Sequence, residues 1–97
     1  MTSTDIIDEK IEADVLWKFF RNKFIGKYHC YESNITKGFP PGARSSILDA
    51  SKRLVKKGLI VSYPKKRETV YVLNIKRIDE IRNIIKKYFP EANLNLF

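Results

Sequence analysis

The sequence of 97 residues contains one cysteine and one histidine, and this scarcity excludes several kinds of site. Because Cys30 has no second cysteine to pair with, the chain can form neither an intramolecular disulfide nor a zinc site built from cysteines. His29 and Cys30 are adjacent, so in a strand their side chains would point to opposite faces instead of sharing a metal ion. We therefore predict no metal site and no bound cofactor, and a reducing cytoplasm fits the free thiol best.

Long apolar runs and catalytic patterns are missing as well. No stretch is long and apolar enough to cross a membrane, and the start, MTSTDIIDEK, lacks the basic and continuously apolar parts of a signal peptide. We expect neither secretion nor membrane insertion. The sequence also contains no glycine-rich phosphate loop, no nucleophile elbow and no paired acid cluster in a basic pocket. We predict that the protein has no catalytic residues and is not an enzyme.

Apolar and basic side chains are abundant. Hydrophobic residues make up 43% of the chain and charged residues 31%, which indicates one folded domain over residues 1–97. There are 19 Lys and Arg residues against 11 Asp and Glu residues, a formal net charge of +8. Such an excess of positive charge attracts polyanions, and nucleic acid is the first candidate among them.

The charges are distributed unevenly along the chain. Residues 1–15 carry five acids and one lysine, a net charge of −4, which leaves +12 on the rest because the whole chain is +8. Between Lys37 and Arg67 there are nine basic residues and a single acid, Asp49. We expect this basic segment to be the contact surface. The acidic residues 1–14 are expected to form a helical extension, which is either a dimer arm or a solvated end.

The spacing of apolar residues predicts an α+β fold that is mainly helical. Apolar residues three and four positions apart predict helices over 5–24, 43–57 and 76–89, and residues 34–37 suffice for about one helical turn. Residues 27–31, 59–63 and 69–75 have the composition of strands, the last two forming a hairpin with a polar tip at 64–68.

Single residues mark the ends of these elements. We expect Gly26 to end the first helix, Gly58 to cap the basic helix in a left-handed conformation and Pro90 to end the last helix. The tail, residues 90–97, keeps three apolar side chains that could pack on the body or on a second chain. Trp17 lies off the apolar stripe of the first helix, at a partly exposed edge of the core or at an interface.

Residues 53–61, Arg-Leu-Val-Lys-Lys-Gly-Leu-Ile-Val, resemble the junction between recognition helix and wing in winged helix-turn-helix regulators, including the multiple-antibiotic-resistance type of repressor. The resemblance covers roughly residues 15–75. The segment 29–40, with Lys37-Gly38-Phe39-Pro40, is also similar to small archaeal winged-helix proteins. Two prolines in the turn at 38–42 and a very short second helix depart from the common form, so the angle of groove entry stays open.

The resemblance implies a winged helix-turn-helix domain with a C-terminal helix packed on it. It also implies that residues 43–57 lie in the major groove of DNA and that the hairpin 59–75 reaches along the backbone or into the minor groove. Polar side chains near the start of such a helix can read base edges, and long cationic side chains can bind phosphates. We assign base reading to Arg44, Ser45, Ser46, Asp49 and Lys52, and phosphate binding to Lys37, Arg53, Lys56, Lys65, Lys66 and Arg67.

These assignments predict a transcriptional regulator that binds double-stranded DNA, either sequence-specifically or generally. We expect a homodimer formed through the first helix, the C-terminal helix or both. One alternative is a protein-interaction adaptor in a larger complex, because the acidic first helix, Trp17 and the apolar tail offer other surfaces. Another is RNA or single-strand binding by exposed aromatic residues, for which the candidates are Tyr28, Tyr31, Phe39, Tyr63 and Tyr71. The plainest explanation of scattered lysines is solubility.

Overall fold

A computed structural model of the chain describes residues 3–95, with side chains from Ile7 to Asn95. The helices are α1 (Ser3–Arg21), α2 (Glu32–Ile35), α3 (Arg44–Lys56) and α4 (Ile78–Tyr88), and the strands are β1 (Cys30–Tyr31), β2 (Ile60–Lys65) and β3 (Glu68–Leu73). Short 3-10 turns, Pro41–Ala43 and Ile75–Arg77, precede α3 and α4. The expected fold class, α+β and mainly helical, is confirmed. The parts of the predicted extension and tail at residues 1–2 and 96–97 lie outside the described residues.

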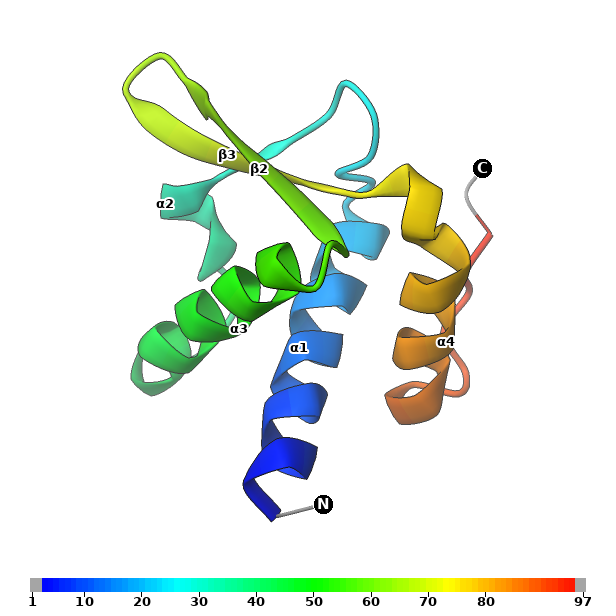
Figure 1. Cartoon of the computed structure of the whole chain (residues 1–97). Coiled ribbons are helices and arrows are strands. Elements are labelled where there is room, and N and C mark those ends of the chain that lie inside the picture. Colours follow the sequence, from blue (N-terminus) through cyan, green and yellow to red (C-terminus); the bar gives the residue numbers. More distant parts are fainter. Residues whose placement is uncertain (1–2, 96–97) are drawn as a thin grey trace.

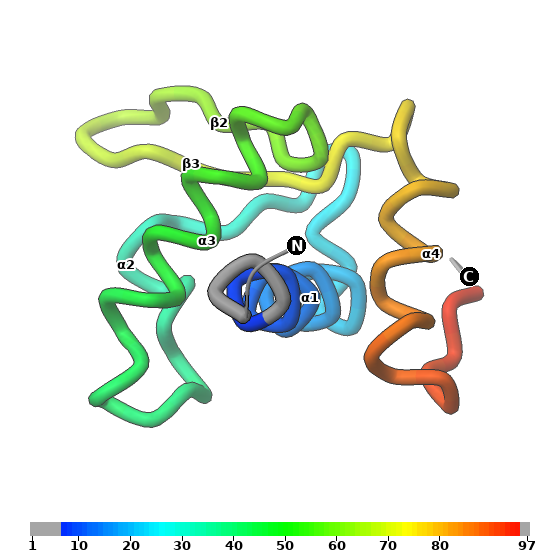
Figure 2. The backbone as a smooth tube through the Cα atoms, turned by 60° about the horizontal axis from the view of Figure 1, so that its bottom comes forward, coloured from blue at the N-terminus to red at the C-terminus, as the bar shows by residue number. Residues whose placement is uncertain are grey.

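Helix α1 lies at the centre of the molecule (Figures 1 and 2). Figure 2 looks along it and shows α3 on one side, α4 on the other and the sheet across the top. Because α1 has neighbours on two sides, its buried residues form a broad band that includes Val15, Leu16 and Phe19. These meet Leu54 of α3 and Ile81 of α4 in one core, so α4 packs on the domain as expected.

The three strands form one antiparallel sheet in the order β1-β3-β2. Cys30 and Ser62 flank Tyr71, and Ile60 pairs with Leu73, which turns these residues toward the core. β2 and β3 pair as far as Lys65 and Glu68, so only Lys66 and Arg67 form the turn. The predicted five-residue tip at 64–68 was therefore too long, because cross-strand pairing continues through its polar residues.

Helices α1 and α3 are each followed by a residue in the left-handed conformation. Gly58 has φ of +80°, and the N–H groups of Gly58 and Leu59 donate to the carbonyls of Val55 and Leu54, each at 3.0 Å. This pattern closes a helix by satisfying its last carbonyls, and it confirms the predicted cap. The same pattern at the end of α1 centres on Lys23, whose φ is 58°. The expectation that Gly26 ends this helix was wrong.

The C-terminal tail returns to the body of the domain within the described residues. Leu94 is buried in the core, and the Nε atom of Arg82 donates to its carbonyl at 3.1 Å. Trp17 is half-buried, with its ring stacked between those of Phe20 and Phe89, so it occupies the expected edge of the core. No helix in the described part of the chain is both long enough and apolar enough to cross a bilayer.

Candidate nucleic-acid interface

A buried lysine of α1 fixes the segment that leads into α3. The ammonium group of Lys18 donates to the carbonyls of Asn34 at 2.8 Å, Ile35 at 2.7 Å and Lys37 at 2.6 Å. These carbonyls lie at and beyond the end of α2, where the last acceptors of a helix lack partners within the helix. Burial lowers the pKa of Lys18, and the three carbonyls supply hydrogen-bond acceptors for its ammonium group. Lys18 thereby holds the turn that carries Lys37 against α1.

Helix α3 presents different residues to the core and to solvent. Ile47, Ala50 and Leu54 face the core. Ser45, Asp49, Lys52 and Lys56 are exposed and follow one another at spacings of four, three and four, which places them on one side of the helix. Arg44 and Ser46 are exposed beside this stripe. The structure therefore brings five predicted base readers and Lys56 to the solvent side of α3.

Arg53 is the predicted phosphate contact that lies elsewhere. Its Nε atom donates to Glu12 of α1 at 2.9 Å, and its guanidinium also lies 3.8 Å from the Asp8 carboxylate. Lys57 donates to the other oxygen of Glu12, whose side chain is only 4% exposed. A buried carboxylate needs such partners because desolvation of an unpaired charge is costly. Arg53 thus joins α3 to α1, and we leave it out of the candidate interface.

This pairing also bears on the acidic N-terminal segment. From Asp8 onward its acids contact basic residues of the domain: Glu12 pairs with α3, and Glu9 accepts hydrogen bonds from Lys87 and Tyr88 of α4. The bonds from Lys87 and Tyr88 lower the pKa of Glu9. The side chains of Asp8, Glu9 and Glu12 therefore join α1 to α3 and α4.

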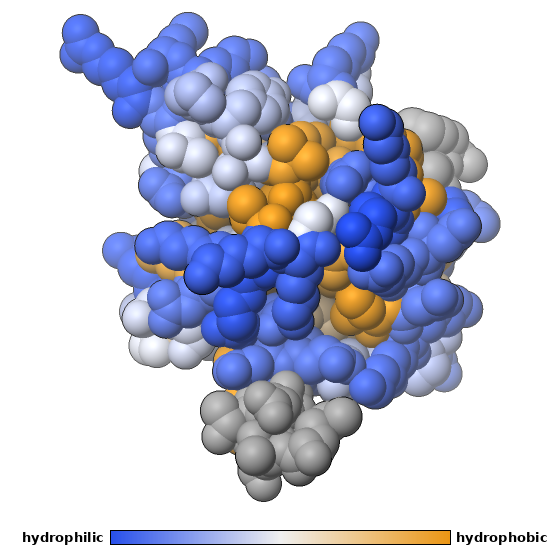
Figure 3. All heavy atoms as spheres, in the orientation of Figure 1, coloured by the Kyte–Doolittle hydropathy of each residue, from blue (hydrophilic) through white to orange (hydrophobic). Residues whose placement is uncertain are grey.

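The hairpin tip, residues 65–68, lies on the same side of α1 as α2 and α3, away from α4 (Figures 1 and 2). Lys65, Lys66 and Arg67 are exposed there, and Lys37 is exposed in the turn after α2. A shallow hollow between the tip and α2 is lined by Tyr31, Ser33 and residues 65–68. Figure 3 shows hydrophilic side chains projecting from the tip and covering α3, with hydrophobic atoms exposed between them.

Seven of the eight predicted cations share a second property. Within the described residues none of them forms an ion pair, whereas Lys10, Arg53, Lys57, Arg77, Arg82 and Lys87 all do. We call these seven residues the basic surface: Lys37, Arg44, Lys52, Lys56, Lys65, Lys66 and Arg67. Their positive charge is available to an anionic partner because no neighbouring carboxylate is bound to it.

The two acids beside the basic surface are engaged in hydrogen bonds. Glu68 accepts the backbone N–H of Ser33 at 2.8 Å, and hydrogen bonding to the side chain and backbone of Ser33 lowers the pKa of Glu68. Glu32 accepts the Tyr71 hydroxyl at 2.7 Å, and burial together with this bond raises the pKa of Tyr71 to about 12. Both contacts join β3 to α2 and hold the hairpin in position.

Sequence reasoning missed one group of residues in this region. His29 lies next to Tyr63 and Lys65, with contacts of 3.5 Å and 3.4 Å from its two ring nitrogens. The alternation of Val61, Tyr63 and Lys65 along β2 placed these three on one face, but nothing local linked that face to His29. Adjacent Cys30 is buried on the opposite face, as expected for neighbours in a strand.

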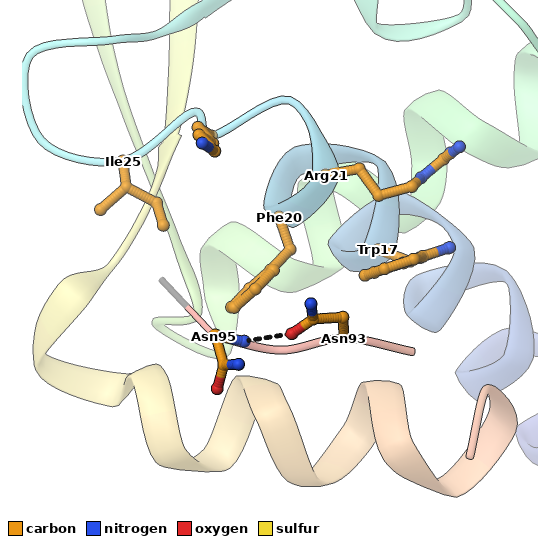
Figure 4. Close-up of a pocket in the computed structure, with 7 residues that line it drawn as sticks. Trp17, Phe20, Arg21, Ile25, Asn93 and Asn95 are labelled. Carbon is orange, nitrogen blue, oxygen red and sulfur yellow. Dashed lines mark hydrogen bonds between the residues drawn. The ribbon is translucent and has the colours of Figure 1, made fainter. Parts of the chain in front are cut away.

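A different cavity lies where the end of α1 meets the tail (Figure 4). It has a volume of about 400 Å³ and is lined by Trp17, Phe20, Arg21, Lys23, Ile25, Asn93 and Asn95. The Arg21 guanidinium lies 5.4 Å from the centre of the Trp17 ring, and the Asn95 N–H donates to the Asn93 side chain at 3.1 Å. None of the basic surface contributes to this cavity.

Comparison of the chain with protein-family models, curated proteins and solved structures finds no match. In the residues that the structure describes, no three His, Cys, Asp or Glu side chains are grouped so that they could hold a metal ion. The assignment of function therefore depends on the basic surface alone.

Proposed function

We propose that the protein is a winged helix-turn-helix regulator that binds double-stranded DNA through α3 and the hairpin. The observation that carries this proposal is the basic surface: seven exposed cations, free of ion pairs in the described chain, on α3, the preceding turn and the hairpin tip. The acids of α1 from Asp8 onward form ion pairs with bases outside the basic surface, so these acids do not cancel its charge.

The fold supports the proposal. The order helix, strand, helix, helix, hairpin is the one that the resemblance to winged helices led us to expect, and β1 lies beside β3 in the sheet. Helix α3 has 13 residues and so a length of about 20 Å, and an α-helix fits the major groove, which is about 12 Å wide. In this arrangement the hairpin would contact the backbone beside the groove.

The residues divide into two proposed roles. Arg44, Ser45, Ser46, Asp49 and Lys52 carry the donors and acceptors that base edges can distinguish. Lys37, Lys56, Lys65, Lys66 and Arg67 bind phosphates, which sets affinity and orientation without reading sequence. Asp49 keeps the exposed stripe of α3 from being uniformly attractive to phosphate, which suits a base-reading position.

Binding to a labelled duplex of random sequence, measured by fluorescence anisotropy between 50 and 200 mM salt, tests the proposal. We expect a steep fall in affinity with salt, with a log–log slope reduced by about 1 in Lys56→Ala or Lys66→Ala, because each removes one phosphate contact. Lys86→Ala is the matched control, since Lys86 is exposed and forms no ion pair in the described chain but lies on α4. Failure to bind at 50 mM salt, or binding indifferent to salt, would refute the proposal.

Selection from random duplexes separates the two roles. Arg44→Ala and Lys52→Ala should change the preferred sequence, each relaxing discrimination by about 1–3 kcal/mol at one position. Lys66→Ala should weaken all duplexes alike. Equal effects of the three variants on every sequence would contradict the division between base reading and phosphate binding.

We also propose the homodimer that the sequence suggested, with the two α3 helices about 34 Å apart so that they reach successive major grooves. Exposed Ile7 on α1, 58% accessible, is one apolar residue available to such a contact. Sedimentation equilibrium tests this, and a monomer bound to a single half-site would contradict it.

A further inference from the structure

The outer face of the sheet carries a small cluster of its own. Val70 is fully buried and Val72 is 8% exposed, yet neither belongs to the main core. In the register, Val70 lies between Tyr63 and Tyr31, and Val72 lies opposite Val61. His29, two residues before Tyr31, lies on this same face by alternation. The ring of His29 contacts the rings of Tyr31 and Tyr63 edge to face.

Two polar side chains lie beside the ring nitrogens of His29. The ammonium nitrogen of Lys65, which can only donate a hydrogen bond, is 3.4 Å from Nε2, and the Tyr63 hydroxyl oxygen is 3.5 Å from Nδ1. A hydrogen bond from Lys65 to Nε2 would require a neutral ring to carry its proton on Nδ1. Both contacts are longer than the usual range for hydrogen bonds, so these side chains are weakly held.

Protonation of His29 would make its contact with Lys65 repulsive. An imidazolium has no acceptor nitrogen, so Lys65 would lose its partner and face a second positive charge. The groups in contact with His29 are Tyr31 on β1 and Tyr63 and Lys65 on β2, and none is acidic. No ion pair in the described chain involves His29, and nearby Glu68 and Glu32 are bound by Ser33 and Tyr71. The added charge would therefore be uncompensated.

We propose that His29, Tyr63 and Lys65 form a phosphate-binding site on the outer face of the hairpin, which binds a nucleic-acid phosphodiester when His29 is protonated. Protonated His29 and the released Lys65 donate charge-assisted hydrogen bonds to the phosphate oxygens, and the Tyr63 hydroxyl donates a third. The inference rests on the proposed function, because it adds a pH-dependent contact to the same DNA-binding surface. His29 is the only histidine in the chain, and histidine is the side chain that changes charge between pH 5 and 8.

The test compares duplex affinity at pH 8.0 and pH 5.5 at fixed salt, by the same anisotropy measurement. We expect the wild type to bind about fivefold more tightly at pH 5.5, with a steeper salt slope by about 1. His29→Gln, which keeps a polar side chain but cannot gain the charge, should gain much less affinity than the wild type between pH 8.0 and pH 5.5. Lys65→Gln should reduce the increase in duplex affinity between pH 8.0 and pH 5.5, although His29 is still present.

The outcomes separate this inference from the proposed function. Binding at pH 8.0 with the same pH dependence in the wild type and His29→Gln overturns this site alone. Absence of duplex binding at both pH values overturns both proposals. The ¹⁵N chemical shifts of the His29 ring at pH 8.0 provide a test that does not require DNA. A proton on Nδ1 supports the contact with Lys65, and a proton on Nε2 contradicts it.

Discussion

At the scale of single residues, two lysines adopt a conformation that normally favours glycine. Lys66, in the hairpin turn, and Lys23, at the end of α1, each have φ of 58°. A left-handed conformation costs a residue with a Cβ atom about 1–2 kcal/mol, and glycine avoids this cost. Both lysines are exposed. The basic surface therefore includes a cation at a position where backbone geometry alone would favour glycine.

Lys66 and Lys23 share the same backbone conformation, so their replacement by glycine allows a matched experiment. Lys66→Gly and Lys23→Gly should each leave the free energy of unfolding unchanged or raise it by up to about 1 kcal/mol, because each relieves the same backbone conformation. Lys66→Gly alone should weaken duplex binding, since Lys23 lies outside the basic surface. Urea denaturation and anisotropy measure the two effects. Equal loss of DNA affinity in both variants would mean that total charge, and not the hairpin tip, controls binding.

Most of the candidate site could be predicted from residue type. Exposed cations follow from their positions opposite the apolar stripe of α3 and in the turn of the hairpin. Arg53 could not be separated from the others because its partner, Glu12, lies 41 residues earlier, and local spacing carries no information about that contact. The same holds for His29, whose contacts with Tyr63 and Lys65 span 34 and 36 residues.

At the scale of elements, the order and type of the helices and strands follow from the sequence. The residues at which they end follow from it only in part. Gly58 capped α3 as expected, since a glycine after an apolar helix is a local signal. Lys23 took the corresponding role in α1, where residue type gave no such signal. The four-residue α2 depends on a tertiary contact, because Lys18 of α1 binds the carbonyls at its end. Isolated helices of this length are not stable in water.

Replacement of Lys18 tests that dependence. Lys18→Met keeps the apolar part of the side chain but removes the ammonium donor shared by three backbone carbonyls, of which that of Asn34 still accepts the N–H of Lys37. We expect a loss of about 2–3 kcal/mol in the free energy of unfolding. Lys10→Met on the same helix removes a partly exposed pair with Asp14 and the contact of the ammonium group with the Phe89 ring, and it should cost about 1 kcal/mol or less. Urea denaturation of both variants provides the comparison. Similar small losses would show that α2 and its turn do not need Lys18.

At the scale of the whole molecule, the positions of the charges matter more than their sum. The acids of α1 pair with α3 on one side and α4 on the other, which leaves the cations of the basic surface unpaired in the described chain. The uneven distribution along the sequence predicted a basic segment. It could not predict that α1 would lie between α3 and α4, because that arrangement depends on contacts between distant segments.

The central claim is that α3 and the hairpin tip contact one DNA duplex together, and titration of ¹⁵N-labelled protein with a duplex tests it most directly. We predict shifts of the backbone amide signals along the exposed stripe of α3, in the turn at Lys37 and at residues 65–68, with α4 and the cavity beside Trp17 unaffected. Shifts confined to α4 or to the cavity, or shifts of α3 without the hairpin, would contradict the account.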